Sequence, residues 1–443
     1  MSFPRYESYK DSRIEWLGDV PEHWKTVSLR WISKRYSGGT PDKLNLKYWT
    51  DGTIPWLNSG AVNEPIITEP SAYISEDALL KSSAKWVPKG ALVMALAGQG
   101  KTKGMAAQLA IKTTCNQSMA AIIPTEEIDA RFLYWWLVTN YQNIRNMAGG
   151  DLRDGLNLEL LGNIPCPLLP YQEQQTITAF LDRETAKIDA LIAEQKRLIE
   201  LLKEKRQSVI SHAVTKGLNP NAPMKDSGIE WLGEVPEHWE VKRLRFIAQL
   251  NPSKSETTEL DRKTEVSFLP MEAIGDDGSL NLERTRPIGE VETGYTYFRE
   301  GDVTIAKITP CFENGKGAVM RGLFGGIGFG TTELIVARAK PFEATSNYLH
   351  WLFISTWFRK HGEASMYGAG GQKRVPDDFV RDFTIVFPAI SEQQTIATFL
   401  ELETAKLDTL TTEAKTAITL LQERRTALIS AAVTGKIDVR GLA

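Results

Sequence analysis

A long repeated stretch constrains the architecture of this chain more than any other feature. The string EQQTITAFLDRETAKIDALIAEQKRLIELLKEKRQ begins at Glu173 and returns as EQQTIATFLELETAKLDTLTTEAKTAITLLQERRT at Glu392, 219 positions later and without a gap. An ungapped repeat of this length indicates two related halves. Ala, Leu, Glu, Lys, Gln and Arg dominate both copies, and neither Pro nor Gly interrupts them before Gly217 and Gly435. Each copy therefore predicts one long helix.

The apolar residues of both copies alternate at spacings of four and three, which is typical of a coiled coil. Antiparallel pairing would bring Glu184 towards Arg424 and Lys205 towards Glu403, so we expect an antiparallel pair. At about 1.5 Å per residue each helix would be roughly 60 Å long. The predicted seam consists of Ile177, Leu181, Ile188, Leu191, Leu198, Leu202 and Val209 in the first copy, and Ile396, Leu400, Leu407, Leu410, Leu421 and Leu428 in the second.

A second, shorter repeat precedes each variable region. KDSRIEWLGDVPEHW at 10–24 returns as KDSGIEWLGEVPEHW at 225–239. No catalytic motif accompanies His23 or His238, so the segment is interpreted as a packing element rich in Trp. The predicted domains are a repeat segment at 1–30, a first recognition domain at 31–165, a first helix at 166–217, a second repeat segment at 218–245, a second recognition domain at 246–386, and a second helix with the tail at 387–443.

The two variable regions share a pattern rather than a sequence. Strand-like runs such as 91–97 and 302–308 alternate with turn residues, and each region ends in an aromatic-rich helix, ARFLYWWLVTNYQNIRNM or NYLHWLFISTWFRKH. This mixture predicts an α+β fold class, with two α+β domains joined by the antiparallel helix pair.

Composition limits the remaining possibilities. The 443 residues suggest about three domains, and no run approaches the ~18 apolar residues that span a bilayer. The polar N-terminus does not resemble a signal peptide, so a cytoplasmic protein is expected. Cys115, Cys166 and Cys311 form no pair at metal-ligand spacing, so neither a disulfide nor a metal site is expected. The net charge of −3 argues against wholesale coating of nucleic acid but not against a local basic face.

Three segments of the sequence resemble catalytic motifs. Residues 95–102 fit a loosened phosphate loop, residues 324–328 resemble the glycine loop of S-adenosylmethionine-dependent methyltransferases, and Glu240 with Lys242 resembles part of a nuclease motif. The phosphate loop and the nuclease motif do not recur in the other half, and the glycine loop lacks both a motif to receive a flipped adenine and a fitting βαβ unit. We therefore predict a chain that is not an enzyme by itself. An ATP-hydrolysing or methylating enzyme remains the alternative, which assays of the purified chain with ATP or S-adenosylmethionine would decide.

Polar loops flanked by glycine recur in both variable regions and predict DNA binding. Lys and Arg neutralise phosphates, while Asn, Gln and Arg can form paired hydrogen bonds with base edges. The predicted DNA-binding residues are Gln99, Lys101, Thr102, Lys103, Asn116, Gln117 and Arg153 in the first region, and Lys307, Asn314, Lys316, Thr331, Thr332, Gln372, Lys373 and Arg374 in the second.

Several segments resemble those of one known family, the specificity subunits of Type I restriction-modification enzymes. The resemblance lies in EWLGDVPEHW and EWLGEVPEHW, in GGTPDK followed by Tyr48-Trp49 and Ile54-Pro55-Trp56, in PYQEQQTITAFLD and ISEQQTIATFLE, and in the closing LISAAVTGKIDVR. It covers essentially the whole chain.

This resemblance implies a non-catalytic, DNA-reading subunit of a bacterial or archaeal complex. Its partners would be double-stranded DNA, two modification (adenine methyltransferase) subunits and restriction subunits. It implies no cofactor on this chain, with S-adenosylmethionine, ATP and magnesium on the partners. Because the variable regions differ, the recognised site should be bipartite and asymmetric, and the helices should set its spacer.

Overall fold

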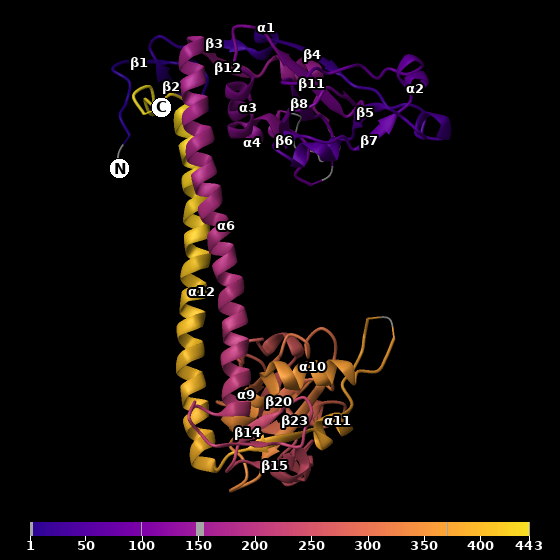
Figure 1. Cartoon of the computed structure of the whole chain (residues 1–443), viewed down its shortest axis with the longest axis vertical. Coiled ribbons are helices and arrows are strands. Elements are labelled where there is room, and N and C mark those ends of the chain that lie inside the picture. The colour runs from indigo at the N-terminus through magenta and orange to yellow at the C-terminus, as the bar shows by residue number, and fades with distance from the viewer. Residues whose placement is uncertain (1–2, 99, 148–154, 370, 443) are drawn as a thin grey trace. The chain divides into compact units, whose positions relative to one another are not determined.

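The computed structural model describes residues 3–98, 100–147, 155–369 and 371–442 (Figure 1). The chain forms two compact units. The first contains Met1–Gln195 and Thr416–Ala443, and the second contains Lys196–Lys415. Each unit therefore holds one recognition domain and a segment from each of two long helices.

The two long helices are α6 (Tyr171–Lys216) and α12 (Ile390–Val433), which confirms the prediction from the repeat. A glycine with a left-handed backbone follows each helix, Gly217 directly after Lys216 at φ 74° and Gly435 two residues after Val433 at φ 72°. This conformation favours glycine at a helix C-terminus. A Cβ on Gly435 would also lie 2.3 Å from Cδ of Pro21, so the closing turn has no room for a larger residue.

In the first unit, segments of α6 and α12 pack against each other in opposite directions. Ile177, Leu181 and Ile188 of α6 share one hydrophobic core with Leu428 of α12. Arg183 contacts the carbonyl of Leu442, whereas Asp189, further along α6, pairs with Arg425, which lies earlier in the chain. These contacts run in antiparallel order.

The second unit repeats this arrangement with the other two helix segments. Ile210 and Val214 of α6 share a core with Ile396 and Leu400 of α12. Arg206 pairs with Asp408 at 3.4 Å. The end of α6 at Gly217 reaches Glu392 near the start of α12, so the segments again run antiparallel. The expected α+β class with an antiparallel helix pair is confirmed.

The predicted seam is correct near the domains and wrong in the middle of the helices. Leu191 and Leu410 are each 46% exposed and Leu198 is 40% exposed, while Ile192 and Ala414 are buried instead. A straight helix drifts by about 20° per heptad relative to a 3.5-residue repeat, so the buried stripe moves off the predicted positions. Leu202 and Leu407 are buried, and Val209 and Leu421 are half-buried.

The predicted ion pairs between the helices are also wrong. Glu184 binds Arg183 and Lys187 of its own helix, and Glu403 binds Lys406 of its own helix. The pairs that do join the helices are Asp189 with Arg425 and Arg206 with Asp408.

The first domain is built on a five-stranded sheet and a three-stranded sheet. The central strand β8 pairs antiparallel with both neighbours. In order, the five strands are β4 (Ser33–Ser37), β11 (Met119–Pro124), β8 (Leu92–Ala95), β9 (Ala106–Leu109) and β6 (Ile66–Ile67), and the three are β10 (Thr114–Cys115), β5 (Ile54–Leu57) and β7 (Ala72–Ile74).

The second domain contains two four-stranded sheets. In order, the first holds β16 (Ala248–Leu250), β23 (Leu334–Ala339), β20 (Val303–Ala306) and β21 (Gly317–Val319), and the second holds β18 (Thr285–Pro287), β17 (Glu265–Leu269), β22 (Ile327–Gly330) and β19 (Thr296–Arg299).

The two domains share one topology. The order β4-β11-β8-β9 matches β16-β23-β20-β21, and the parallel pair β5 and β10 matches the parallel pair β17 and β22. The domains differ at the sheet edges, where β6 occurs in the first and β19 in the second. A shared frame with different additions is the arrangement that the sequence pattern predicted.

Short strands and helices attach each domain to the repeat segments. In the first unit β1 (Tyr9–Asp11) pairs with β2 (Asp19–Pro21), and β3 (Lys25–Ser28) pairs with β12 (Pro165–Leu168). In the second unit the pairs are β13 (Met224–Asp226) with β14 (Glu234–Pro236), and β15 (Glu240–Arg243) with β24 (Thr384–Phe387). Trp24 and Trp239 of the two segments are fully buried, in agreement with a packing role.

Each aromatic-rich stretch forms two helices instead of one. The first contains α3 (Ala130–Thr139) and α4 (Tyr141–Asn146), and the second contains α9 (Ser346–Ile354) and α10 (Thr356–Ala364). The second break occurs at Ser355, whose hydroxyl accepts a hydrogen bond from the backbone N–H of Phe358. A serine in this position caps a new helix and so competes with continuing the old one.

Within the described residues, no helix is both long and apolar enough to cross a bilayer. The same part of the chain contains no group of three His, Cys, Asp or Glu side chains arranged to hold a metal ion.

Candidate nucleic-acid interface

The predicted DNA-binding loops meet where one central strand ends in each domain. After β8, the backbone N–H of Leu96 donates to Ser118 at 2.8 Å, and the carbonyl of Leu96 accepts from the N–H of Leu156 at 2.8 Å. After β20, Lys307 makes the same two bonds, donating to Glu333 and accepting from Val375, each at 2.8 Å. The two strand ends therefore hold equivalent loops in equivalent places.

In the first domain, the loop between β8 and β9 presents Lys101 to solvent. The Lys101 carbonyl accepts a hydrogen bond from the Tyr141 hydroxyl at 2.6 Å, which ties the loop to α4. Thr102 is half-buried. Lys103 is only 5% exposed, so it does not belong to the accessible surface, contrary to its predicted role. Gln99 and Arg153, also predicted to bind DNA, lie outside the described residues.

Asn116 and Gln117 form the turn before β11 and lie beside the GGTP segment. The Asn116 side chain accepts from the backbone N–H of Ser118 at 3.1 Å, and the Gln117 amide oxygen accepts from the hydroxyl of Thr40. Gly38 packs so closely that a Cβ there would lie 1.9 Å from the carbonyl oxygen of Cys115. Gln117 is exposed, and Thr40 joins it as a residue of this surface that the loop pattern missed.

In the second domain, Arg374 is occupied by an internal partner. Its guanidinium donates to both carboxylate oxygens of Glu333, at 2.7 and 2.9 Å. These hydrogen bonds hold the pKa of Glu333 below its usual value. Because both of these donors of the Arg374 guanidinium bind Glu333, few remain to contact a base edge. Arg374 therefore holds the loop in place in this structure.

Other polar residues of the second domain surround this pair. The hydroxyl of Thr309 donates to the Lys373 carbonyl at 2.9 Å, which places the loop that carries Lys373 beside the end of β20. Lys316 donates to the carbonyl of Met271 at 3.2 Å and is half-buried. The exposed members of the predicted set are Asn314, Thr332, Gln372 and Lys373, and the half-buried members are Lys307, Lys316, Thr331 and Arg374.

The local structure does not support the three catalytic motifs. Strand β9, rather than a helix, follows the loop of residues 96–105, so the helix N-terminus on which a phosphate loop depends is not formed there. The glycine loop at 324–328 leads directly into strand β22. The ammonium of Lys242 lies 2.9 Å from Glu240 and 2.8 Å from Glu343, which is a surface ion-pair network.

The EQQ motif that starts each long helix connects helix, repeat segment and domain. The buried carboxylate of Glu173 accepts from the Tyr6 hydroxyl at 2.8 Å and from the Trp24 indole at 3.0 Å, and it lies 2.8 Å from His23. Burial and this carboxylate raise the pKa of Tyr6. In the second unit, Glu392 pairs with His238 at the same distance. The two histidines thus bind the helix starts and have structural partners.

Gln174 and Gln393, the next residues in the motif, fasten the helix starts to the domains. Gln174 accepts from the backbone N–H of Asp129 at 2.7 Å and donates to the carbonyls of Glu127 and Leu169. Gln393 forms the same three bonds, with the N–H of Thr345 and the carbonyls of Glu343 and Pro388. All six partners are backbone groups.

The fold and the site together define a protein with two binding domains that share one topology and differ in their exposed side chains. The profile of the family described as Type I restriction modification DNA specificity domain matches residues 21–201 and 236–420. The chain belongs to this family, and the domain occurs twice in it.

Known proteins of this kind are similar to the chain over different lengths. The specificity subunit of the Type I restriction enzyme EcoEI from Escherichia coli is 45% identical over 172 residues, 38% of this chain and 28% of the relative. The corresponding subunit of EcoAI from the same organism is 47% identical over 37% of this chain and 27% of its own length. The matches therefore span about a quarter of these two relatives. The subunit of MjaVIII from Methanocaldococcus jannaschii is 22% identical over 100% of this chain and 99% of its own.

Solved structures share the fold. A chain from a study of complex assembly and conformational transition of the type I R-M system has a TM-score of 0.70 at 15% identity, covering 94% of this chain and 98% of its own. The crystal structure of the HsdS subunit from Thermoanaerobacter tengcongensis has a TM-score of 0.57 at 14% identity, with the same coverage.

Proposed function

We propose that the chain is the DNA sequence-specificity subunit of a Type I restriction-modification complex and that each domain reads one half of a bipartite, asymmetric site. The observation that carries this proposal is the pair of equivalent strand ends at Leu96 and Lys307. The same backbone bonds hold both sets of loops, yet the exposed side chains differ, with Lys101 and Gln117 on one and Gln372 and Lys373 on the other. Two domains with the same backbone arrangement and different exposed side chains are suited to recognising two different base sequences.

The helices would set the distance between the half-sites. Each helix is continuous through both units, 46 residues in α6 and 44 in α12. A continuous helix transmits its length as a fixed rise of about 1.5 Å per residue. The spacer between half-sites should then follow the helix length.

The repeat segments at 10–24 and 225–239 would dock two modification subunits. They are nearly identical in sequence and occur once in each unit, so they offer the same surface twice. The methyltransferase and restriction partners would bind S-adenosylmethionine, ATP and magnesium. Adenine methylation would then require the target base to be flipped out of the duplex into the partner's active site.

Exchange of one recognition domain tests this proposal. Cells that express the chain with its modification subunits should carry methylated adenines in one bipartite motif, as read by methylome sequencing. Replacing residues 31–165 with the corresponding region of a relative should change one half of that motif and leave the other half and the spacer unchanged. A change in both halves would rule out independent reading.

A further inference from the structure

The helix and the recognition domain of the first unit are joined by an arginine that has no counterpart in the second. The guanidinium of Arg131, from α3, lies 2.9 Å from the carboxylate of Asp182 on α6. It also lies 4.7 Å from the ring centre of Tyr134 and 4.8 Å from that of Trp135. The Trp135 indole donates to the same carboxylate at 3.0 Å. Arg131 thus fills a site made of one carboxylate and two aromatic rings.

The equivalent positions of the second unit can be assigned from the structure. Gln174 binds the N–H of Asp129, the N-cap of α3, and Gln393 binds the N–H of Thr345, the N-cap of α9. Counting from these caps, Arg131, Tyr134 and Trp135 correspond to Asn347, His350 and Trp351. Counting from the glutamines, Asp182 corresponds to Glu401. The carboxylate, the indole and an aromatic ring are therefore retained, while the arginine is replaced by Asn347.

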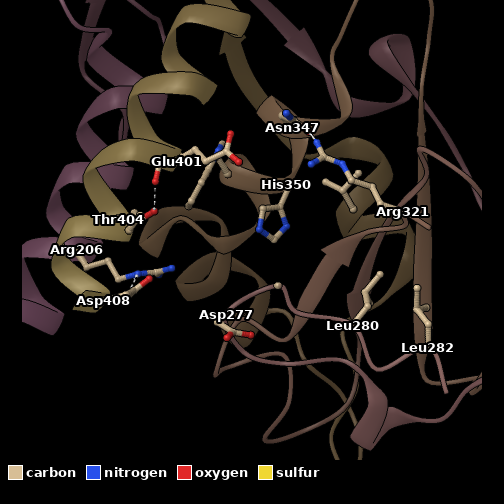
Figure 2. Close-up of a pocket in the computed structure, with 14 residues that line it drawn as sticks. Arg206, Asp277, Leu280, Leu282, Arg321, Asn347, His350, Glu401, Thr404 and Asp408 are labelled. Atoms are coloured by element: carbon tan, nitrogen blue, oxygen red, sulfur yellow. Dashed lines mark hydrogen bonds and ion pairs between the residues drawn. The ribbon is translucent and has the colours of Figure 1, made fainter. Parts of the chain in front are cut away.

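A cavity of about 430 Å³ lies at this place in the second unit, and Asn347, His350, Trp351 and Glu401 all line it. Figure 2 shows His350 between the α12 residues on one side and the loop of Asp277 and Leu280 on the other. Within the described residues, Nδ1 of His350 is buried without a hydrogen-bond partner, and no cationic side chain lies within ion-pair distance of Glu401. The cavity is therefore lined by groups whose counterparts bind Arg131 in the first unit.

The charges around the cavity favour a cation. The acidic groups that line it are Asp277, Glu401 and Asp408, and the basic groups are Arg206 and Arg321, which gives a formal sum of −1. In the first unit, Arg425 pairs with Asp189 and leaves room for Arg131. Arg206 pairs with Asp408 in the same way in the second unit, so its presence is compatible with another guanidinium in the cavity. Arg321 donates to the amide oxygen of Asn347, towards which its guanidinium points (Figure 2). One added positive charge would neutralise the site.

We propose that this cavity binds a guanidinium group, and that in the assembled complex the group is an arginine side chain of a partner protein. The incoming guanidinium would occupy the position that Arg131 occupies in the first unit, bind the Glu401 carboxylate and pack against the ring of Trp351. The planar fork of a guanidinium matches a carboxylate beside an aromatic face better than an ammonium does. The identity of the partner rests on the proposed function, whereas the guanidinium site rests on the cavity alone.

The free chain tests the site with N-acetyl-L-argininamide as the probe, followed by ligand-observed NMR. We expect binding of one molecule in the millimolar range, as is usual for so small a ligand, and at least tenfold weaker binding of N-acetyl-L-lysinamide. Asn347→Arg supplies the missing side chain internally and should weaken probe binding at least tenfold. Glu401→Gln should weaken it about tenfold. Urea unfolding of each variant shows that it folds.

A matched variant in the first unit provides the positive control. Arg131→Asn opens the equivalent site and should raise the number of bound probe molecules from one to two. Equal binding of the lysine and arginine probes would overturn guanidinium recognition. Unchanged probe binding in folded Asn347→Arg would show that the probe binds elsewhere and would overturn the proposed guanidinium site. Absence of probe binding to the wild-type chain would also overturn it.

The assembled complex tests the source of the arginine. With two modification subunits bound, as verified by sedimentation velocity, the cavity should no longer take up the probe. Full probe binding in that complex would overturn the proposal that an arginine of a partner protein fills the cavity. If the wild-type chain bound no modification subunit at all, the proposed function would fail, and the site would still be judged by the results on the free chain.

Discussion

The guanidinium of Arg425 lies 2.9 Å from the carboxylate of Asp189, and this ion pair joins the two long helices in the first unit. Its repeat equivalent is the pair of Arg206 with Asp408, because both residues are displaced by 219 positions and exchange helices. The internal repeat is thus conserved at the level of single contacts. Both pairs are partly exposed, so each contributes only about 0.5 kcal/mol to stability.

Charge reversal tests this relationship. Asp189→Arg would place two like charges together and should lower the free energy of unfolding by about 1 kcal/mol at low salt. Adding Arg425→Asp should recover most of that loss, as measured by urea unfolding. The same cycle with Glu184 and Arg424 should show no coupling, because Glu184 binds Arg183 and Lys187 of its own helix. Coupling in the control cycle alone would contradict the observed register.

Loss of an exposed lysine at either strand end should weaken DNA binding uniformly across sequences. If Lys101 and Lys373 each contact a phosphate as proposed, Lys101→Ala or Lys373→Ala should flatten the slope of log affinity against log salt by about one unit. Fluorescence anisotropy with a labelled duplex at several salt concentrations measures this slope. Lys406→Ala, in an ion pair on α12, serves as the control and should leave the slope unchanged. A lysine whose removal does not change the slope would not contact a phosphate.

Removal of a helix-start glutamine should be costly. Gln174 is fully buried, and Gln174→Ala would leave one backbone N–H and two carbonyls without their partner. The expected loss is about 3 kcal/mol in the free energy of unfolding of the first unit. Gln175→Ala changes the exposed neighbouring residue and should cost less than about 0.5 kcal/mol. Equal losses for the two variants would contradict the role of Gln174.

The stability of the second unit should depend on pH through His350. Burial, together with the charges of Arg206 and Arg321, lowers the pKa of His350 to about 4 from an ordinary value of 6.5. Between these values the unfolded chain binds more protons than the folded one, so stability is complete above pH 6.5 and falls as the pH decreases towards 4. The loss should reach roughly 3 kcal/mol near pH 4.

His350→Gln removes the titrating group and should flatten this part of the pH profile. Urea unfolding of both proteins between pH 4 and 7 makes the comparison. Parallel profiles for wild type and variant would show that His350 does not contribute.

The helix length should determine the spacer of the recognised site. Deleting one heptad from both helices, residues 191–197 and 410–416, would shorten the pair by about 10 Å. This length corresponds to about three base pairs of duplex. Methylome sequencing should then show an unchanged pair of half-sites with a shorter spacer. An unchanged spacer would show that the helices do not measure distance.

Sequence periodicity and repetition predicted the architecture well because both depend on many residues at once. The two long helices, the shared frame of the domains and the closing glycines are all visible as patterns. The seam prediction failed at Leu191, Leu198 and Leu410 because small rotations add up along a helix. The same rotation explains why Arg425, which binds Asp189, joins the two helices instead of Arg424, which was predicted to face Glu184.

Single residues of the site were harder to predict than the architecture. Lys103 lies in a loop that is polar on average, yet it is buried, and Arg374 binds Glu333 rather than facing solvent. Neither fact has a signature in one sequence, because both depend on loops that meet only in the folded domain. The correspondence of Arg131 with Asn347 could not be predicted from the sequence, because it depends on the equivalent bonds of Gln174 and Gln393 that align the two halves.

The same two glutamines have a consequence for how new specificities arise. Their six partners are main-chain groups, four of them in the domains and two, the carbonyls of Leu169 and Pro388, just before the helices. A domain of a different sequence supplies such groups when its backbone follows the common path. These particular bonds therefore place no demand on the side chains of the recognition domain, unlike the contacts of Arg131 and Trp135 with Asp182. At the two glutamines, an exchanged domain would have to reproduce a backbone path, whereas at Asp182 it would also have to reproduce side chains.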